Sequence, residues 1–243
     1  MMATRNGVIK RVAVKEFEYQ RRGGKIAVDL DEGDSLDFVV KTGGEDEVIL
    51  ASHNGQAIRF KEDQARVMGR GARGVRGMTL SDGDYITGAA VVREDAMLLS
   101  ITENGYGKLT PFEEYSRHGR GGKGIVCHAI TEKTGLLCGI AAVSMEDDVM
   151  MITNEGTMIR TPVSDIRVCG RPSQGVIVMR LSEDAHVVNF AAVKDEEQAA
   201  KDAEKDAELI VDETETAEIT ELTENEEEIE LLEIEVDESD DDI

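Results

Sequence analysis

The sequence has little of what membrane-spanning, secreted and disulfide-stabilised proteins need. It has no tryptophan, three prolines and three cysteines in 243 residues, and no run of about 18 apolar residues that would predict a membrane span. The first residues, MMATRNGVIKR, lack the apolar middle of a secretory signal. The cysteines Cys127, Cys138 and Cys169 stand singly, without a CxxC pair. We therefore expect a cytoplasmic protein, not bound to a membrane, whose reduced thiols are buried packing residues.

The excess negative charge lies mostly in residues 194–243. The formal net charge of the chain is -24, and this segment holds 24 of the 51 acidic residues but only three of the 27 basic ones. Blocks of like charge repel each other and stay solvated, and this one contains no glycine, proline or aromatic residue. We expect 194–243 to be an acidic tail that is disordered when free. Residues 1–193 are long enough for one domain with a sizeable core.

Four similar segments recur within residues 1–193. They read RNGVIKR, HNGQAIRF, ENGYGKLT and NEGTMIRT, and their glycines follow one another at intervals of 48, 50 and 51 residues. The glycines are Gly7, Gly55, Gly105 and Gly156. Asn-Gly between short β-rich runs predicts a hairpin, because the mirror-image turn that it favours needs positive φ.

Each repeat also supplies a second pair of apolar runs about 20 residues after its hairpin, which gives four strands a repeat. No helical pattern interrupts these strands before the tail. The sequence predicts an all-β, propeller-like ring or arc of about four four-stranded blades. The expected repeats are about 1–44, 45–93, 94–144 and 145–193.

Basic residues gather between the two hairpins of every repeat, in EYQRRGGK, RVMGRGARGVRG, EYSRHGRGGKG and RVCGRPSQG. Glycine beside arginine lets backbone N–H groups approach an anion together with the guanidinium group. Any one loop is explained equally well as a solvated turn, but recurrence in all four repeats favours a curved row of phosphate-binding loops for double-stranded DNA. The candidate DNA-binding residues are Gln20, Arg21, Arg22, Gly23, Gly24, Lys25, Arg70, Arg73, Arg76, Arg117, Arg120, Gly121, Gly122, Lys123 and Arg171.

Motifs for cofactors, metals and catalysis fail on their context. GRGARG and GRGGKG match the dinucleotide fingerprint but precede strand-like runs instead of a helix. GGKG ends on Gly124, where a Walker A loop needs serine or threonine. The four histidines are scattered, and acidic pairs such as Asp82 and Asp84 lie at turns. We therefore expect no cofactor, no metal and no catalytic residue in this chain.

Several segments closely resemble the C-terminal domain of DNA gyrase A. They are QRRGGK, RGGKG, ITENGYGKLT and VMMITNEGTMIRTPVSDIRVCGRPSQGVIVMRL. The resemblance extends over residues 1–193 and the acidic tail, and it implies a β-pinwheel that wraps duplex DNA and supports negative supercoiling by a type II topoisomerase. It also implies the N-terminal region of gyrase A and the gyrase B protein as partners. The family's gyrase box, Q-R-R-G-G-K/R-G, is matched at 20–25, with Ile26 replacing its last glycine, and in part at 120–124.

The sequence also departs from the pattern of that family. The family domain usually has six blades, of which four are visible, and no tyrosine here can be matched to the DNA-cleaving one. We therefore expect DNA binding without cleavage, with the tail competing with DNA for the basic loops. The alternatives are the equivalent domain of topoisomerase IV, which lacks a strong box, and a protein-interaction propeller whose acidic tail captures basic partners. An independent hydrolase is disfavoured by the absence of a catalytic constellation.

Overall fold

The computed structural model describes residues 1–19 and 22–194. The chain divides into one unit, Met1–Val193, and a second, Lys194–Ile243. Gln20, Arg21 and the expected acidic tail from residue 195 onward lie outside the described residues. The described helices are 3-10 turns of three or four residues, and none of them is long and apolar enough to cross a membrane.

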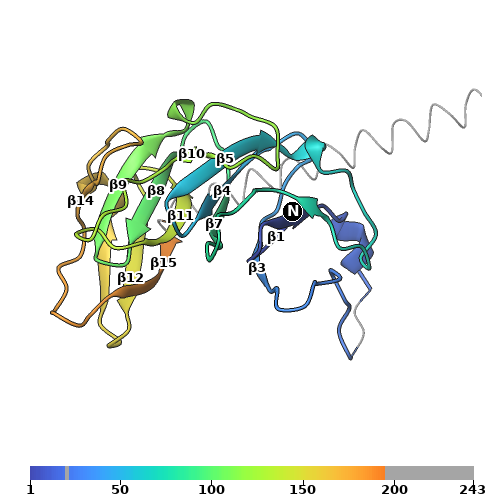
Figure 1. The fold of residues 1–243 in the computed structure, drawn as a ribbon, viewed down its shortest axis with the longest axis horizontal. Coiled ribbons are helices and arrows are strands. Elements are labelled where there is room, and N and C mark those ends of the chain that lie inside the picture. Colours follow the sequence, from blue (N-terminus) through green and yellow to red (C-terminus); the bar gives the residue numbers. More distant parts are fainter. Residues whose placement is uncertain (20–21, 195–243) are drawn as a thin grey trace, which may run out of the picture. The chain divides into compact units, whose positions relative to one another are not determined.

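Each repeat runs through a hairpin, a 3-10 turn, a basic loop and a longer final strand (Figure 1). The first repeat contains β1 (Met2–Thr4), β2 (Val8–Lys10), η1 (Val14–Phe17) and β3 (Leu36–Val39). The second contains β4 (Glu47–Ser52), β5 (Gln56–Lys61), η2 (Glu62–Gln64), β6 (Val75–Arg76) and β7 (Ile86–Val91). The third contains β8 (Met97–Thr102), β9 (Tyr106–Pro111), η3 (Phe112–Glu114), β10 (Ile125–Val126) and β11 (Leu137–Val143). The fourth contains β12 (Asp148–Thr153), β13 (Met158–Pro162), η4 (Val163–Asp165), β14 (Val176–Ile177) and β15 (Val187–Val193).

The hairpins form where the sequence predicts them, but with a different turn. The four turn glycines have φ between 74° and 84°, and no described non-glycine residue has a positive φ. The amide of Gly7 donates to the carbonyl of Thr4 at 3.1 Å, and the amide of Gly55 donates to that of Ser52 at 2.9 Å. The mirror-image turn needs positive φ at the asparagine as well. The predicted turn type is therefore wrong, although the predicted hairpins are present. An ordinary turn followed by a left-handed glycine makes each hairpin.

The sheets exchange strands between repeats. Their orders are β3-β1-β2-β6, β10-β5-β4-β7, β11-β8-β9-β14 and β13-β12-β15. The short strands β6, β10 and β14 therefore pair with β2, β5 and β9 of the preceding repeat, and not with the final strand of their own. Residues 22–35, where the first repeat has the matching apolar run, contain no strand. The prediction of an all-β fold with four propeller-like blades is confirmed, although the last described sheet has three strands.

The apolar core lies between consecutive sheets. One cluster joins Ile9 and Ala3 of the first repeat to Leu50 and Phe60 of the second. A second cluster joins the second and third repeats around Ile49, and a third cluster joins the third and fourth repeats. Burial of these side chains, at about 25 cal/mol per Å² of apolar area, holds each sheet to the next. Each repeat is thus bound to its neighbour by both core packing and an exchanged strand.

Candidate nucleic-acid interface

The four basic loops occupy one place in the repeat, after the 3-10 turn. They are loop 1 (18–25), loop 2 (66–77), loop 3 (114–124) and loop 4 (167–175). Loops 2, 3 and 4 end on the short strands that pair with the preceding sheet or directly precede them, so each crosses from its own sheet to its neighbour's. The exchange of strands therefore decides where these loops lie.

Arginines at one repeated position join three of the loops to the preceding loop or to the residues that directly follow it. Nη1 of Arg70 donates to the carbonyl of Ile26 at 3.4 Å. Arg120 donates in the same way to the carbonyl of Arg76 at 3.0 Å, and Arg171 donates to that of Val126 at 2.8 Å. Through these bonds, the end of each loop lies beside the loop of the next repeat. They also engage three predicted DNA-binding arginines in structural contacts.

Two buried lysines hold the loops from beneath. Lys108 is fully buried, and its Nζ donates to the carbonyls of Gly170 at 2.9 Å, Ser173 at 3.0 Å and Arg171. Lys10 is also buried, and its Nζ donates to the carbonyls of Ala27 at 2.8 Å and Arg70. Burial lowers the pKa of Lys108 to about 8 and also lowers the pKa of Lys10. Sequence reasoning missed both lysines, whose only signal is a lysine within an apolar strand.

Carboxylates neutralise some of the predicted cations. Arg73 lies 3.1 Å from Asp29 and 3.0 Å from Asp31. Arg117 lies 3.0 Å from Glu47. Burial acts to raise the pKa of Glu47, but hydrogen bonds from Arg59 and Arg117 hold this pKa below its usual value. Arg73 and Arg117 thus offer less charge to a polyanion than the sequence suggests.

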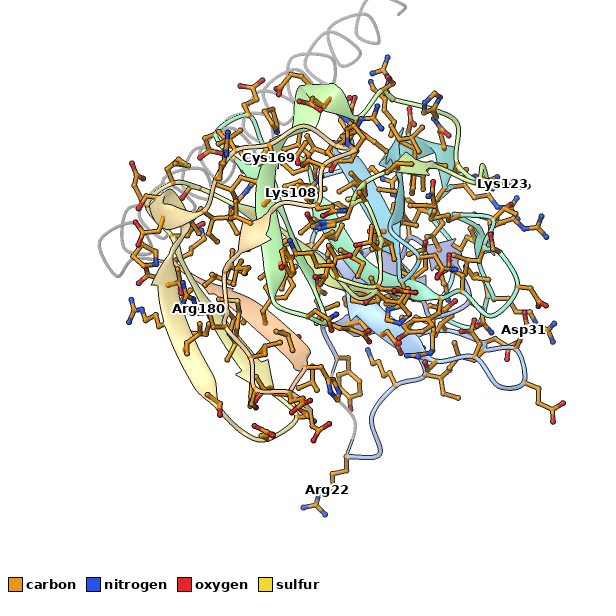
Figure 2. All side chains as sticks on the ribbon, turned by 60° about the vertical axis from the view of Figure 1, so that its left-hand side comes forward. Arg22, Asp31, Lys108, Lys123, Cys169 and Arg180 are labelled. Carbon is orange, nitrogen blue, oxygen red and sulfur yellow. The ribbon has the colours of Figure 1, made fainter. Side chains whose placement is uncertain are left out.

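Other cations of the loops are exposed and have no ion pair among residues 1–19 and 22–194. They are Arg22, Arg66, Arg76, Lys123 and Arg167, of which the sequence prediction included three. Figure 2 shows Arg22 and Lys123 extending away from the ribbon into solvent. Lys25 instead donates to the carbonyl of Glu16 at 3.0 Å. Because these side chains are exposed, phosphates can reach them directly.

The loop glycines leave the backbone open beside these cations. A Cβ on Gly23 or Gly24 would meet nothing within 4 Å, whereas a Cβ on Gly122 would lie 3.4 Å from Ile58. Gly121 has a φ of 83° and its position faces the carbonyl of Arg76 at 3.6 Å. Gln20 and Arg21 of the predicted site lie outside the described residues. The predicted cations thus fall into two groups, exposed arginines and lysines on the one hand and arginines that bond one loop to the next on the other.

Comparisons with known proteins give a consistent result. A family model described as DNA gyrase C-terminal domain, beta-propeller, matches residues 1–42, 46–93, 96–132 and 147–194. DNA gyrase A of Escherichia coli strain K12 is 45% identical over 192 residues, which are 79% of this chain and 22% of that protein. DNA gyrase A of Staphylococcus aureus strain NCTC 8325 is 38% identical over 229 residues, 93% of this chain and 26% of that protein. The chain thus spans about a quarter of the length of these relatives.

Two solved structures match at 28% identity over 79% of this chain. A DNA gyrase A C-terminal domain matches with a TM-score of 0.70 and is covered over 64% of its length. The C-terminal domain of a DNA topoisomerase IV matches with a TM-score of 0.75 and is covered over 61% of its length.

Proposed function

The chain belongs to the DNA gyrase A C-terminal domain family, and on that premise we propose that it binds and bends double-stranded DNA without sequence preference. In this proposal the four basic loops form one track for the phosphates of a curved duplex. The chain acts as the DNA-wrapping part of a gyrase that introduces negative supercoils. Its partners are duplex DNA, the N-terminal region of gyrase A and the gyrase B protein, and its location is the bacterial cytoplasm.

The observation that carries the proposal is the repeated arginine bond between consecutive loops. Arg70, Arg120 and Arg171 each donate to a carbonyl in the preceding loop or within two residues of its end, which supports a single track made of loops from different repeats. Phosphate contacts of this kind bind DNA without reading bases. The loops hold few aromatic side chains, and Tyr115 is buried, which favours duplex phosphates over stacked single-stranded bases.

Salt dependence is the direct test of this mechanism. Five loop cations are exposed and unpaired among the described residues, and each neutralised phosphate contributes about -0.9 to the slope of log affinity against log salt concentration. We expect a slope of about -4.5 for duplex DNA, measured by fluorescence anisotropy with two unrelated sequences. A flat response would rule out phosphate binding.

A variant pair separates the loops from general surface charge. Arg76→Ala with Lys123→Ala should weaken binding equally for both DNA sequences and make the slope shallower by about 2. The control is Arg180→Ala, an exposed arginine that lies outside the loops (Figure 2). If the control weakens binding as much as the double variant, the loops have no special role.

The likeness to topoisomerase IV supports a second candidate function, the DNA-binding domain of that enzyme. The two candidates differ in the reaction of the whole enzyme. Joined to the remaining parts of a gyrase, this chain should restore the introduction of negative supercoils into relaxed plasmid DNA. Relaxation or decatenation without supercoiling would favour the topoisomerase IV function.

A further inference from the structure

The three junctions between repeats, where a short strand pairs with the preceding sheet, also share a backbone bond between loops. An amide that follows the basic loop of one repeat donates to a carbonyl within the basic loop of the next, at 2.9 to 3.3 Å. The donor and acceptor pairs are Asp29 with Ala72, Thr79 with Gly122, and Ala129 with Ser173. The residue directly after each acceptor therefore holds one equivalent place in loops 2, 3 and 4. These residues are Arg73, Lys123 and Gln174.

At the first junction this place holds a cation bound by two carboxylates. Nε of Arg73 donates to Oδ2 of Asp29 at 3.1 Å, and its Nη1 donates to Oδ1 of Asp31 at 3.0 Å. The side chain of Arg73 is 68% exposed, and those of the two aspartates are 54% and 58% exposed. One positive charge thus faces two negative charges at the surface, so the group is negative overall.

At the second junction the same place is open. Lys123 is exposed and has no ion pair among residues 1–19 and 22–194. The positions equivalent to Asp29 and Asp31 are held by Thr79 and Ser81, which carry no charge. Figure 2 shows Asp31 and Lys123 along the same edge of the molecule. An anion that reaches this edge meets a free cation at loop 3.

The third junction has no charged group at this place. Gln174 is neutral, and the positions equivalent to the two aspartates are held by Ala129 and Thr131. The backbone bond between loops is present at all three junctions. The three copies of the place therefore differ in charge: negative around Arg73, positive at Lys123 and neutral at Gln174.

Carboxylates and phosphates compete for the same donors. Both bind a guanidinium group through its fork of N–H groups, and exposed ion pairs of this kind contribute little to stability. A DNA phosphate that displaced Asp29 and Asp31 from Arg73 would leave two free carboxylates beside the duplex, and like charges repel. The two aspartates thus oppose DNA at the place where, one repeat later, Lys123 attracts it.

We propose that this repeated place is a phosphate-binding position of the basic track, open at Lys123 and closed at Arg73 by the carboxylates of Asp29 and Asp31. The affinity of loop 2 for duplex DNA is thereby held below that of loop 3. Contact with the duplex is uneven along the track, and DNA leaves loop 2 before loop 3 as the salt concentration rises. This inference rests on the proposed function, because it concerns the same loops.

The test opens loop 2 and closes loop 3 in the full chain. Asp29→Asn with Asp31→Asn keeps the shape of both side chains and removes their charge, which frees Arg73. Ser81→Asp places a carboxylate beside loop 3 at the position equivalent to Asp31, where the native serine is exposed. Thr79 is left unchanged, because its hydroxyl donates to the carbonyl of Gly121 at 2.7 Å.

The readout is binding of duplex DNA by fluorescence anisotropy at a series of salt concentrations. The double asparagine variant should bind about three- to tenfold more tightly than wild type at low salt, because two repelling charges are gone. Its slope of log affinity against log salt concentration should be steeper by about 0.9, the contribution of one more neutralised phosphate. Ser81→Asp should bind more weakly, with a slope shallower by about 0.9.

Two further variants assign the effect to the place itself. Arg73→Ala, added to the double asparagine variant, should make the slope shallower by about 0.9, as Lys123→Ala does in the wild type. The matched control for loss of negative charge is Glu94→Gln with Asp95→Asn. These carboxylates are exposed, lie outside the four loops and have no ion pair among the described residues, so their loss should tighten binding less.

The proposal is overturned if the double asparagine variant binds no more tightly than this control. Weaker binding would also overturn it, because the carboxylates would then orient Arg73 towards the duplex. Binding of the wild type that does not depend on salt would instead contradict the proposed function, and this inference with it. Thermal melts check that each variant is folded, and the Ser81→Asp and asparagine variants test the proposal independently of each other.

Discussion

Lys108 offers the sharpest test of how the fold positions a basic loop. Its ammonium group lies within the protein and donates to three carbonyls of loop 4, those of Gly170, Arg171 and Ser173. We consider the change Lys108→Met, which gives an unbranched side chain one heavy atom shorter and removes the donor. The carbonyls then lose their buried partner, and loop 4 loses the group that holds it against β9.

The magnitude follows from two opposing effects. An unsatisfied buried polar group costs about 1–3 kcal/mol, and three carbonyls share the loss, although removing a buried charge gives part of this back. We expect a net loss of about 2 kcal/mol in the free energy of unfolding, or roughly 4–8 °C in Tm for a domain of this size. The matched control is Ile58→Met at the equivalent buried position of the second repeat, where a swap of similar volume should cost less than about 1.5 kcal/mol.

The assay is urea unfolding of both variants, with amide hydrogen exchange in loop 4 as a local readout. Lys108→Met should speed exchange at the amides of loop 4, and Ile58→Met should not.

The pH dependence of the free energy of unfolding is an independent test. The pKa of Lys108 falls from its ordinary 10.5 to about 8 on folding, so between these values the unfolded chain binds more protons than the folded one. Stability of the wild type should therefore rise relative to Lys108→Met as pH increases from 8 towards 10. Equal stability of the two methionine variants, or a wild-type advantage that shrinks over this pH range, would refute the reasoning.

Three further predictions test other contacts. Gly175→Ala should destabilise the protein more than Gly24→Ala in thermal melts at low protein concentration, because both positions have a positive φ but only the first faces a carbonyl, at 2.4 Å. Alkylation of the native protein should modify Cys169 first, since burial raises the pKa of Cys127 and takes that of Cys138 to about 12; early labelling of Cys127 in mass spectra would contradict this. Removal of residues 194–243 should tighten DNA binding at low salt if the acidic segment competes for the basic loops, and equal or weaker binding in a gel shift would contradict that competition.

The repeat and its hairpins could be predicted from the sequence because their signals are local. Gly7, Gly55 and their equivalents mark the turns, and the apolar runs beside them mark the strands. The partner of a two-residue strand such as β6 has no local signal, since Val75 and Arg76 suit their own sheet as well as the preceding one. The exchange becomes visible only through the pairing of Val8 with Arg76.

The candidate site was predictable as four loops, and its DNA-binding role stays a prediction. The sequence does not reveal which arginines are held by carbonyls or carboxylates of the protein and which are exposed. The carboxylates that neutralise Arg73 come from Asp29 and Asp31, more than 40 residues earlier in the chain. Lys108 was missed for a related reason: lysine is ordinarily exposed, and only a loop some 62 residues later supplies the carbonyls that bury it.

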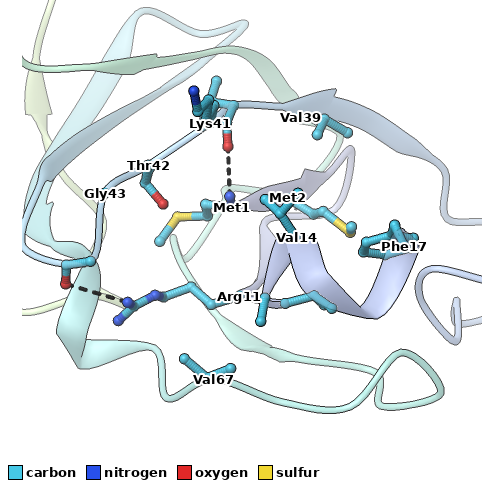
Figure 3. Close-up of a pocket in the computed structure, with 14 residues that line it drawn as sticks. Met1, Met2, Arg11, Val14, Phe17, Val39, Lys41, Thr42, Gly43 and Val67 are labelled. Carbon is cyan, nitrogen blue, oxygen red and sulfur yellow. Dashed lines mark hydrogen bonds between the residues drawn. The ribbon is translucent and has the colours of Figure 1, made fainter. Parts of the chain in front are cut away.

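The exchanged strands make each loop depend on two repeats. Loop 3 starts at the end of η3 in the third repeat and leads into β10 on the second sheet. It is held to loop 2 by bonds such as that from Gly121 N to the carbonyl of Gly77. Figure 3 shows the start of the first repeat, where Val14 and Phe17 of η1 lie beside Val39 and Val67. A change that loosens one junction should therefore move the cations of the loop across it, even when no basic residue is altered. Because the arginine bonds link one loop to the next, such a displacement would alter the spacing of phosphate contacts on both sides of the junction. The geometry of the four basic loops therefore depends on the pairing between neighbouring repeats, and not on any blade alone.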